Sequence, residues 1–112
     1  MEFQREAEFM RTIRHPNIVL FIGAGVMPPS SIGAASIPFL VVEYMPRGTL
    51  LSVLNDKTVH IDHQQRLRMA LDIAKGMRFL HGLTPPRVHR DLKSANLLVS
   101  DHFVVKVSRE HF

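Results

Sequence analysis

The most constraining feature of this 112-residue chain is one long helical pattern between Asp62 and Gly82. The Asp62 carboxylate can accept hydrogen bonds from first-turn amides, and Gln65 occupies the reciprocal position of a capping box. Apolar residues then recur every three or four positions, which predicts a buried structural stripe formed by Leu67, Ala70, Ile73, Ala74, Met77 and Leu80. Gly82 and the prolines that follow it end the pattern. The sequence therefore predicts one long helix over 62–82.

Two short apolar runs before this helix predict strands. Residues 18–22 and 39–44 are rich in β-branched and aromatic residues and are too short for helices. We expect them to pair antiparallel across a loop over 28–36 that is rich in proline and serine. Gly23-Ala24-Gly25 is interpreted as a strand-end turn, because Pro28 stands at the third glycine position of a phosphate-binding GxGxxG loop and no helix follows.

Shorter patterns complete the layout. An apolar stripe predicts a first helix from Glu2 to about Thr12, and Thr49 can cap a short helix over 49–54. Two short runs, 97–99 and 103–107, predict a hairpin. The order helix, two strands, two helices and hairpin predicts one domain of the α+β class.

Composition and charge exclude several classes of protein. The absence of cysteine excludes a disulfide framework, a Cys-based zinc site and thiol catalysis, and is typical of a cytoplasmic or nuclear protein. Residues 18–42 are uncharged, but prolines interrupt them well short of the about 20 apolar residues that a spanning helix needs, so we expect no membrane span. No export signal is expected, because the first six residues carry two acids and no apolar core. The net charge is +4, yet acids alternate with bases, so we expect no nucleic-acid partner.

The segment between the long helix and the hairpin carries the chemistry. Residues 88–96 read Val-His-Arg-Asp-Leu-Lys-Ser-Ala-Asn. Phosphoryl transfer requires a carboxylate near the incoming hydroxyl and oxygen ligands for Mg²⁺, and Asp91 and Asn96 on one loop can supply the base and a metal ligand. Lys93 can place an ammonium over the γ-phosphate of ATP. The structural alternative is a polar loop in which Asp91 caps a turn and Lys93 lies in solvent.

The same residues fill every fixed position of H-R-D-L-x-x-x-N, the catalytic-loop pattern of protein kinases. Nearly the whole chain resembles the middle of a eukaryotic protein kinase domain, most closely in the tyrosine-kinase-like group around the Raf-like and mixed-lineage MAP kinase kinase kinases. Three further stretches carry the resemblance: RHPNIV at 14–19, VVEYMPRGTL at 41–50 and IAKGMRFLH at 73–81. It implies a partial kinase-like fold with a small-lobe remnant over 1–42, a hinge over 43–48 and the start of the large lobe over 49–112.

The resemblance implies ATP and Mg²⁺ as cofactors and assigns a nucleotide site. The Glu43 carbonyl and the Met45 backbone would form hydrogen bonds to adenine, and Leu98 would lie beneath its ring. Val42 falls at the gatekeeper position beside this site. Lys93 is similar to the serine/threonine type of catalytic loop rather than the form usual in tyrosine kinases.

The resemblance also implies regulatory residues. Glu6 would pair with the nucleotide-positioning lysine of the third strand of the small lobe. Arg90 would receive a phosphorylated activation loop. Met10, Phe21 and His89 match three positions of the family's regulatory hydrophobic stack.

Several kinase parts are missing from these 112 residues. There is no Gly-rich loop and no Val-Ala-Ile-Lys strand, and the first lysine is Lys57. Arg109-Glu110-His111 stands where the family has Asp-Phe-Gly. Because phosphoryl transfer depends on positioning and electrostatics, we expect these residues alone to be inactive.

Two functions of different classes stay open. One is a segment of a protein serine/threonine kinase, shortened because the gene or its assigned reading frame is truncated. The other is a non-catalytic kinase-like module that binds another kinase. The expected partner is a protein substrate or another kinase. We also expect low solubility or dimerisation, because apolar side chains such as Phe21 and Val41 would lie open to solvent and the long helix would be only half covered.

Overall fold

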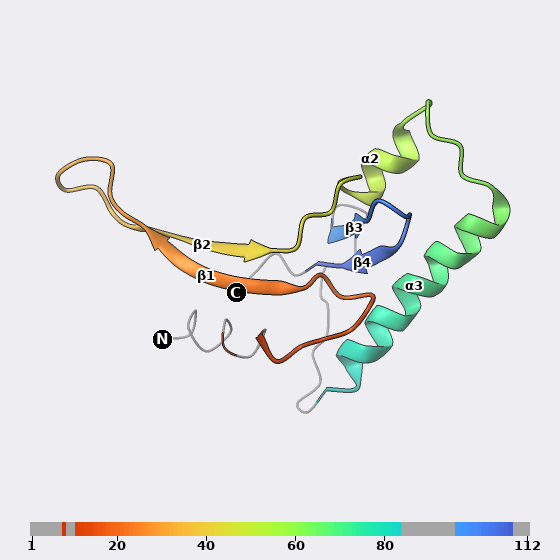
Figure 1. Cartoon of the computed structure of the whole chain (residues 1–112), viewed down its shortest axis with the longest axis horizontal. Coiled ribbons are helices and arrows are strands. Elements are labelled where there is room, and N and C mark those ends of the chain that lie inside the picture. The colour runs from red at the N-terminus through yellow and green to blue at the C-terminus, as the bar shows by residue number, and fades with distance from the viewer. Residues whose placement is uncertain (1–7, 9–10, 84–95, 109–112) are drawn as a thin grey trace. The chain divides into compact units, whose positions relative to one another are not determined.

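A computed structural model describes residue 8 and residues 11–83 and 96–108. Their elements are, in chain order, β1 (Phe21–Met27), β2 (Ile37–Val42), α2 (Leu50–Asn55), α3 (His63–His81), β3 (Leu97–Val99) and β4 (Val105–Val107) (Figure 1). The α+β class is therefore confirmed. The first helix expected over 2–12 lies largely outside the described residues, and the backbone is helical at Glu8 and Arg11, where it is described.

The described residues divide into two compact units. One contains those of 1–14 and 20–43, and the other contains those of 15–19 and 44–111. The first unit is built on a two-stranded sheet and the second on α2, α3 and the β3–β4 pair.

In the first unit, β1 and β2 form the expected antiparallel pair. The register runs from Phe21 opposite Val42 to Met27 opposite Ile37, with an irregularity between Phe21 and Gly23. Beyond the Phe21–Val42 end of this pair, Oε1 of the Glu43 side chain accepts the Leu20 N–H at 2.8 Å. The Glu43 N–H donates to the Leu20 carbonyl at 2.9 Å.

The predicted turn at Gly23-Ala24-Gly25 is wrong, because these residues lie inside β1. Gly25 pairs with Phe39, and a Cβ built on Gly25 would stand 2.5 Å from Cζ of the Phe39 ring. Glycine inside a strand often marks such a close approach. These glycines therefore make room for a cross-strand ring and do not reverse the chain.

The first strand also begins later than predicted, and its exposure is uneven. Ile18 and Val19 belong to the second unit, where Ile18 forms a parallel bridge to Val107.

The expected exposure of Phe21 is wrong, since Phe21 is 3% exposed, whereas Val41 is 42% exposed as expected. Successive side chains of a strand point to opposite faces, which is why Phe21 is buried while Ile22 is exposed.

In the second unit, the helix starts are confirmed. Asp62 Oδ1 accepts the Gln65 N–H at 2.8 Å, and Gln65 Oε1 accepts the Asp62 N–H at 3.4 Å, which completes the capping box. Thr49 Oγ1 accepts the Ser52 N–H at 3.1 Å at the start of α2. Side-chain caps satisfy amides that the first helical turn leaves without partners.

The buried stripe of α3 is only partly as predicted. Leu80 is buried, but Leu67 is 58% exposed, and the other two buried residues are Met69 and Gly76. The face that packs on the strands is displaced because Gly76 permits a close approach: a Cβ there would lie 2.7 Å from the Asn17 carbonyl oxygen. Leu67 and Leu71 are left exposed among the described residues, in accord with the expected half-covered helix.

The β3–β4 hairpin is confirmed, with Leu97 opposite Val107 and Val99 opposite Val105. Its second strand is shorter than the predicted 103–107 because Phe103 adopts a left-handed backbone with φ of 63° and closes the turn. The Ser100 hydroxyl oxygen accepts the Val104 N–H at 3.1 Å inside this turn. Val99 and Val105 are fully buried and form the centre of the second unit.

The segment over 15–19 is bonded to β4 mainly through Asn17. The Asn17 side-chain Nδ2 donates to the Val105 carbonyl at 3.1 Å, and the Asn17 carbonyl accepts the Val107 N–H at 2.8 Å. The Val19 N–H donates to the Val107 carbonyl at 3.0 Å. Asn17 is 4% exposed, so these bonds lie where water competes little.

Within the described residues, neither helix combines the length and the apolar character that a membrane crossing requires.

We predict that Gly76→Ala destabilises the chain by about 1–3 kcal/mol, because the added methyl group meets a backbone oxygen that cannot rotate away. Alanine has a higher helix propensity than glycine, so propensity alone predicts that the variant is more stable than the wild-type chain. Urea denaturation measures the free energy of unfolding.

Gly82→Ala is the matched control, because its Cβ would meet its nearest atom at 3.4 Å, an ordinary contact. We expect this control to change stability by less than about 0.5 kcal/mol. Equal or greater stability of Gly76→Ala would contradict the close packing of α3 on Asn17.

Candidate functional site

The two ends of the β3–β4 hairpin are held together at the point where the 88–96 segment finishes. The Ser108 N–H donates to the Asn96 carbonyl at 2.9 Å. Asn96 is 3% exposed and directly precedes β3, and Ser108 directly follows β4. The backbone therefore brings the last residue of the 88–96 pattern beside the chain that leads into Arg109.

A second segment runs along the other edge of β3. The Arg47 N–H donates to the Val99 carbonyl at 3.2 Å, and the Val99 N–H donates to the Gly48 carbonyl at 2.8 Å. Thr49 and Leu98 form an antiparallel bridge. The residues that follow Met45 are thus aligned on the strand that carries Leu98.

Met45 itself is held by a tight turn. Its carbonyl accepts the Gly48 N–H at 3.0 Å, and Gly48 has φ of 74°, a left-handed conformation that glycine adopts readily. The Met45 side chain is buried. Among the residues that the structure describes, none accepts a hydrogen bond from the Met45 N–H.

The remaining predicted site residues are placed as follows. Glu43 lies in the first unit, is half-buried and has its carboxylate bonded to the Leu20 amide. Val42 ends β2 and is 42% exposed. Leu98 is half-buried and pairs with Lys106. Asp91, Lys93, Arg90, Glu6, Met10 and His89 lie outside the described residues, so their roles stay predictions.

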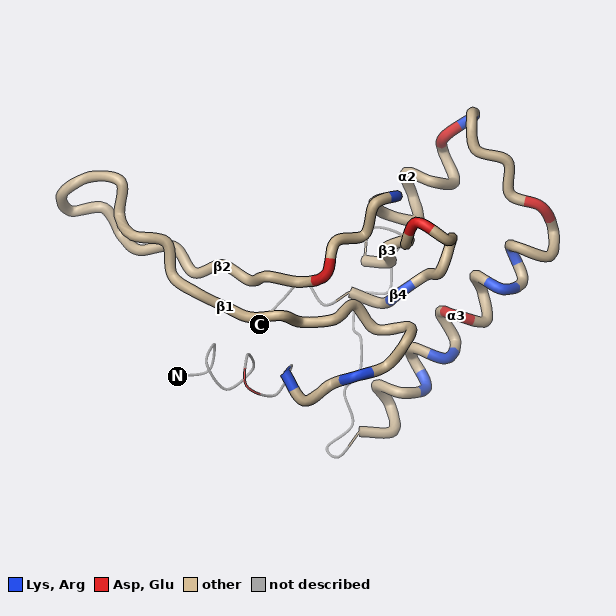
Figure 2. The backbone as a smooth tube through the Cα atoms, viewed as in Figure 1, with Lys and Arg blue, Asp and Glu red and all other residues tan. Residues whose placement is uncertain are grey.

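Two residues that sequence reasoning did not single out hold the hairpin. Asn17 bonds to both ends of β4, and the Asp72 carboxylate of α3 accepts the Val105 N–H at 3.0 Å. Asp72 is the only acidic residue of α3 and stands among its lysine and arginine residues (Figure 2). Asn17 lies within the quoted RHPNIV stretch, whereas no local pattern marks Asp72 as an anchor.

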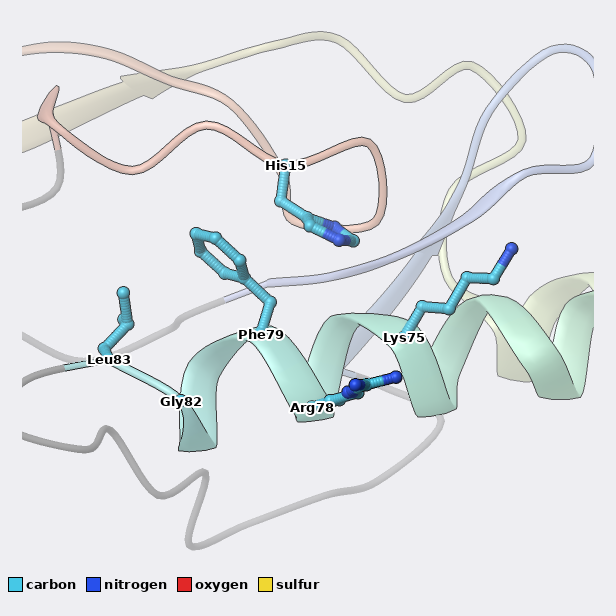
Figure 3. A pocket seen from close by; sticks show the side chains of 6 residues that line it. All are labelled: His15, Lys75, Arg78, Phe79, Gly82 and Leu83. Carbon is cyan, nitrogen blue, oxygen red and sulfur yellow. The ribbon is translucent and has the colours of Figure 1, made fainter.

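A pocket of about 400 Å³ lies beside the end of α3 and is lined by His15, Lys75, Arg78, Phe79, Gly82 and Leu83 (Figure 3). The His15 and Phe79 ring centroids are 4.8 Å apart, and His15 Nδ1 accepts the Asn17 N–H at 3.0 Å. His15 therefore helps to fix the Asn17 segment on α3. None of the described site predictions lines this pocket.

The described residues contain no group of three or more His, Cys, Asp or Glu side chains placed to hold a metal ion. Asn96, the one residue predicted to bind a metal ion, lies within the described residues.

Comparison with known proteins decides the family. The chain matches the model of the family "Protein tyrosine and serine/threonine kinase" over residues 1–110. The chain belongs to the protein kinase family. The expected resemblance to a partial kinase domain of the tyrosine-kinase-like type is thereby confirmed.

Individual relatives agree with this assignment. The chain is 48% identical over 106 residues to the "Probable serine/threonine-protein kinase SIS8" of Arabidopsis thaliana, and 48% identical over 108 residues to the "Serine/threonine-protein kinase CTR1" of the same plant. It is 42% identical over 107 residues to the "Probable serine/threonine-protein kinase drkA" of Dictyostelium discoideum. These matches cover 95%, 95% and 96% of the chain, and 10%, 12% and 16% of the respective relatives.

The described site can now be understood as part of a kinase domain. Protein kinases generally use ATP and Mg²⁺ and act on protein substrates. The β3–β4 hairpin, the turn after Met45 and the Asn17 anchor are the parts of that domain whose geometry is described in this chain. Their bonds determine where the 88–96 segment ends.

We predict that Asn17→Ala lowers the free energy of unfolding by about 1–3 kcal/mol, because it leaves the buried Val105 carbonyl without its side-chain donor. Asn55→Ala is the matched control, since Asn55 is exposed at the end of α2. Urea denaturation of both variants measures the difference. Similar stabilities of the two variants would contradict an anchoring role for Asn17.

Proposed function

We propose that the chain is the catalytic-loop portion of a serine/threonine protein kinase, which transfers the γ-phosphate of ATP to protein hydroxyls when the rest of the kinase domain is present. The observation that carries this proposal is the complete H-R-D-L-x-x-x-N pattern over 89–96 in a chain of this family. The relatives named above carry the serine/threonine kinase description in their own names.

The proposed chemistry is shared among three residues of one loop. Asp91 accepts the proton of the substrate hydroxyl, and Lys93 stabilises the charge that develops on the transferring phosphoryl group. Asn96 offers a carboxamide oxygen, a hard ligand of the kind that Mg²⁺ prefers. The burial of Asn96 and its bond to Ser108 support a fixed position for the end of this loop.

The proposed nucleotide site uses backbone groups of Glu43 and Met45 and the side chain of Leu98. Two observations within the second unit support the Met45–Leu98 part: the Met45 N–H has no acceptor among the described residues, and the next residues pair with β3. Adenine recognition by a backbone donor and an apolar side chain is typical of nucleotide pockets. Val42 would border this pocket as gatekeeper.

The proposed regulation follows the family pattern and, apart from Phe21, concerns residues outside the described part. Glu6 would pair with a lysine of the third small-lobe strand, and Arg90 would receive a phosphorylated activation loop. Met10, Phe21 and His89 would belong to the hydrophobic stack. The described burial of Phe21, 3% exposed, is compatible with such a position.

We propose that residues 1–112 by themselves do not transfer phosphate. Mg²⁺ in kinases is held by carboxylate and amide oxygens together with substrate phosphates, and Arg109 supplies a cation where the carboxylate is needed. The oxygen ligands in these residues therefore do not suffice to hold the ion. The residues before Lys57 also contain no lysine that could bind the α- and β-phosphates of ATP.

A chimera tests the catalytic proposal. Residues 1–108 replace the matching residues of the Arabidopsis kinase CTR1, so that the relative supplies the rest of the kinase domain. We predict that the chimera phosphorylates a generic basic protein substrate and that Asp91→Asn lowers kcat by about 10²–10⁴-fold, because the base is lost. Transfer of radiolabelled phosphate from ATP measures the rate.

Asp56→Asn is the control, because this exposed carboxylate lies in the loop after α2 and belongs to none of the proposed sites. A folded chimera that is inactive, or one that keeps its activity after Asp91→Asn, would refute the catalytic proposal. Measurable transfer by residues 1–112 alone would refute the proposal that they are inactive by themselves.

A non-catalytic binding module is the second candidate, and one observation favours it. The β1–β2 pair exposes apolar side chains on most of its length, including Ile22, Val26, Ile37, Phe39 and Val41. Exposed apolar patches of this kind mark contact surfaces or aggregation sites. We propose that residues 1–112 alone associate through this surface with a second copy or with another kinase.

We predict that residues 1–112 elute as a dimer or larger species in size-exclusion chromatography with light scattering. Val41→Lys shifts the chain toward monomer, because it places a charge on the exposed strand. Thr58→Lys, on an exposed loop outside the sheet, is the control for added charge. A monomeric wild-type chain would refute association with a second copy.

A further inference from the structure

Arg47 makes side-chain and backbone contacts to two different parts of the β3–β4 hairpin. Its Nε–H donates to the Asp101 carbonyl at 3.1 Å, and its Cζ lies 3.8 Å from the centroid of the Phe103 ring. Its backbone N–H donates to the Val99 carbonyl. One residue therefore bonds the chain after Met45 both to β3 and to the turn beyond β3.

The turn that receives Arg47 is conformationally demanding. Phe103 has φ of 63°, a conformation that is costly for an aromatic residue. The Arg47 guanidinium lies over the ring and is hydrogen-bonded to the Asp101 carbonyl, so it holds the turn from outside. A planar group does this better than an ammonium. The Phe103 ring and the Asp101 carbonyl thus form a contact site that fits an arginine side chain.

The consequence is a fixed distance between two parts of the proposed nucleotide site. Met45 stands two residues before Arg47, and Leu98 stands one residue before Val99 on the strand to which Arg47 is bonded. A movement of the 45–49 segment along or away from β3 would change the separation of the Met45 N–H and the Leu98 side chain. Arg47 opposes that movement through its backbone bond to Val99 and its side-chain contacts with the hairpin turn.

We propose that Arg47 is a positioning residue for the nucleotide: through Phe103 and Asp101 it sets the spacing between the Met45 backbone donor and the Leu98 side chain, and so controls affinity for ATP. This inference rests on the proposed nucleotide site. Arg47 does not touch the reacting atoms in this account. Its loss therefore weakens nucleotide binding and leaves the rate of the bound complex nearly unchanged.

The test uses the CTR1 chimera described above, in which the kinase domain is complete. Arg47→Ala is expected to raise KM for ATP and Kd for ADP about three- to ten-fold, with kcat within about two-fold of the unsubstituted chimera. Arg47→Lys is expected to give most of the same loss, because lysine keeps the charge without the planar group and the Nε–H donor.

The contact partner and a matched arginine provide the controls. Phe103→Leu removes the ring and is expected to raise KM for ATP two- to five-fold, whereas Phe103→Tyr keeps an aromatic face and restores a KM near that of the unsubstituted chimera. Arg66→Ala is the matched control, because Arg66 also donates its Nε–H to a backbone carbonyl, that of Ile61 at 3.3 Å. Its KM and kcat are expected to stay unchanged.

The outcomes separate this inference from the proposed function. If the chimera binds ATP and Arg47→Ala and Phe103→Leu leave KM and Kd unchanged, or lower kcat alone, the positioning role is refuted and the proposed function stands. If the unsubstituted, folded chimera does not bind ADP by calorimetry, the proposed nucleotide site fails, and the inference fails with it. Should Arg47→Ala not fold, the Phe103→Leu and Phe103→Tyr pair decides the question.

Discussion

The hydrogen bonds between Asn17 and β4 are the interaction on which the second unit depends. They join residues 88 and 90 positions apart in the chain and pair the edge of a strand that is only three residues long. A strand pair of this size is marginal on its own and needs packing against other elements. Asn17, Asp72 and Gly76 supply that packing, the first two by hydrogen bonds to β4 and the third by allowing α3 to approach.

This arrangement explains how a short hairpin can fix the end of the 88–96 segment. The buried valines of β3 and β4 hold the strands together, and the bond from Ser108 to Asn96 closes their open ends. The residue that ends the H-R-D-L-x-x-x-N pattern is therefore fixed by the core of the unit. On the opposite edge of β3, the turn after Met45 is aligned by main-chain bonds and by the Arg47 side chain.

Sequence patterns predicted the elements better than they predicted the contacts between them. The Asp62–Gln65 capping box and the Thr49 cap involve residues three positions apart, so local chemistry was enough to place both helix starts. The face of α3 was misplaced because its packing is decided by the approach of Gly76 to Asn17, which is far away in sequence. The glycines of β1 were misinterpreted for the same reason, since their use depends on the Phe39 ring across the sheet.

The candidate site divides in the same way. Residues proposed from a local sequence pattern, such as Asp91 and Asn96, could be named from the sequence, whereas Asp72 and Arg47 contact partners about 30 and 55 positions away. The most direct test is a crystal structure of the CTR1 chimera with Mg²⁺ and a non-hydrolysable ATP analogue. The account predicts the adenine edge at the Met45 N–H, Leu98 beneath the ring, and the Asn96 amide oxygen about 2.1 Å from a Mg²⁺ ion. Nucleotide bound elsewhere, or Asn96 turned away from the metal, would contradict it.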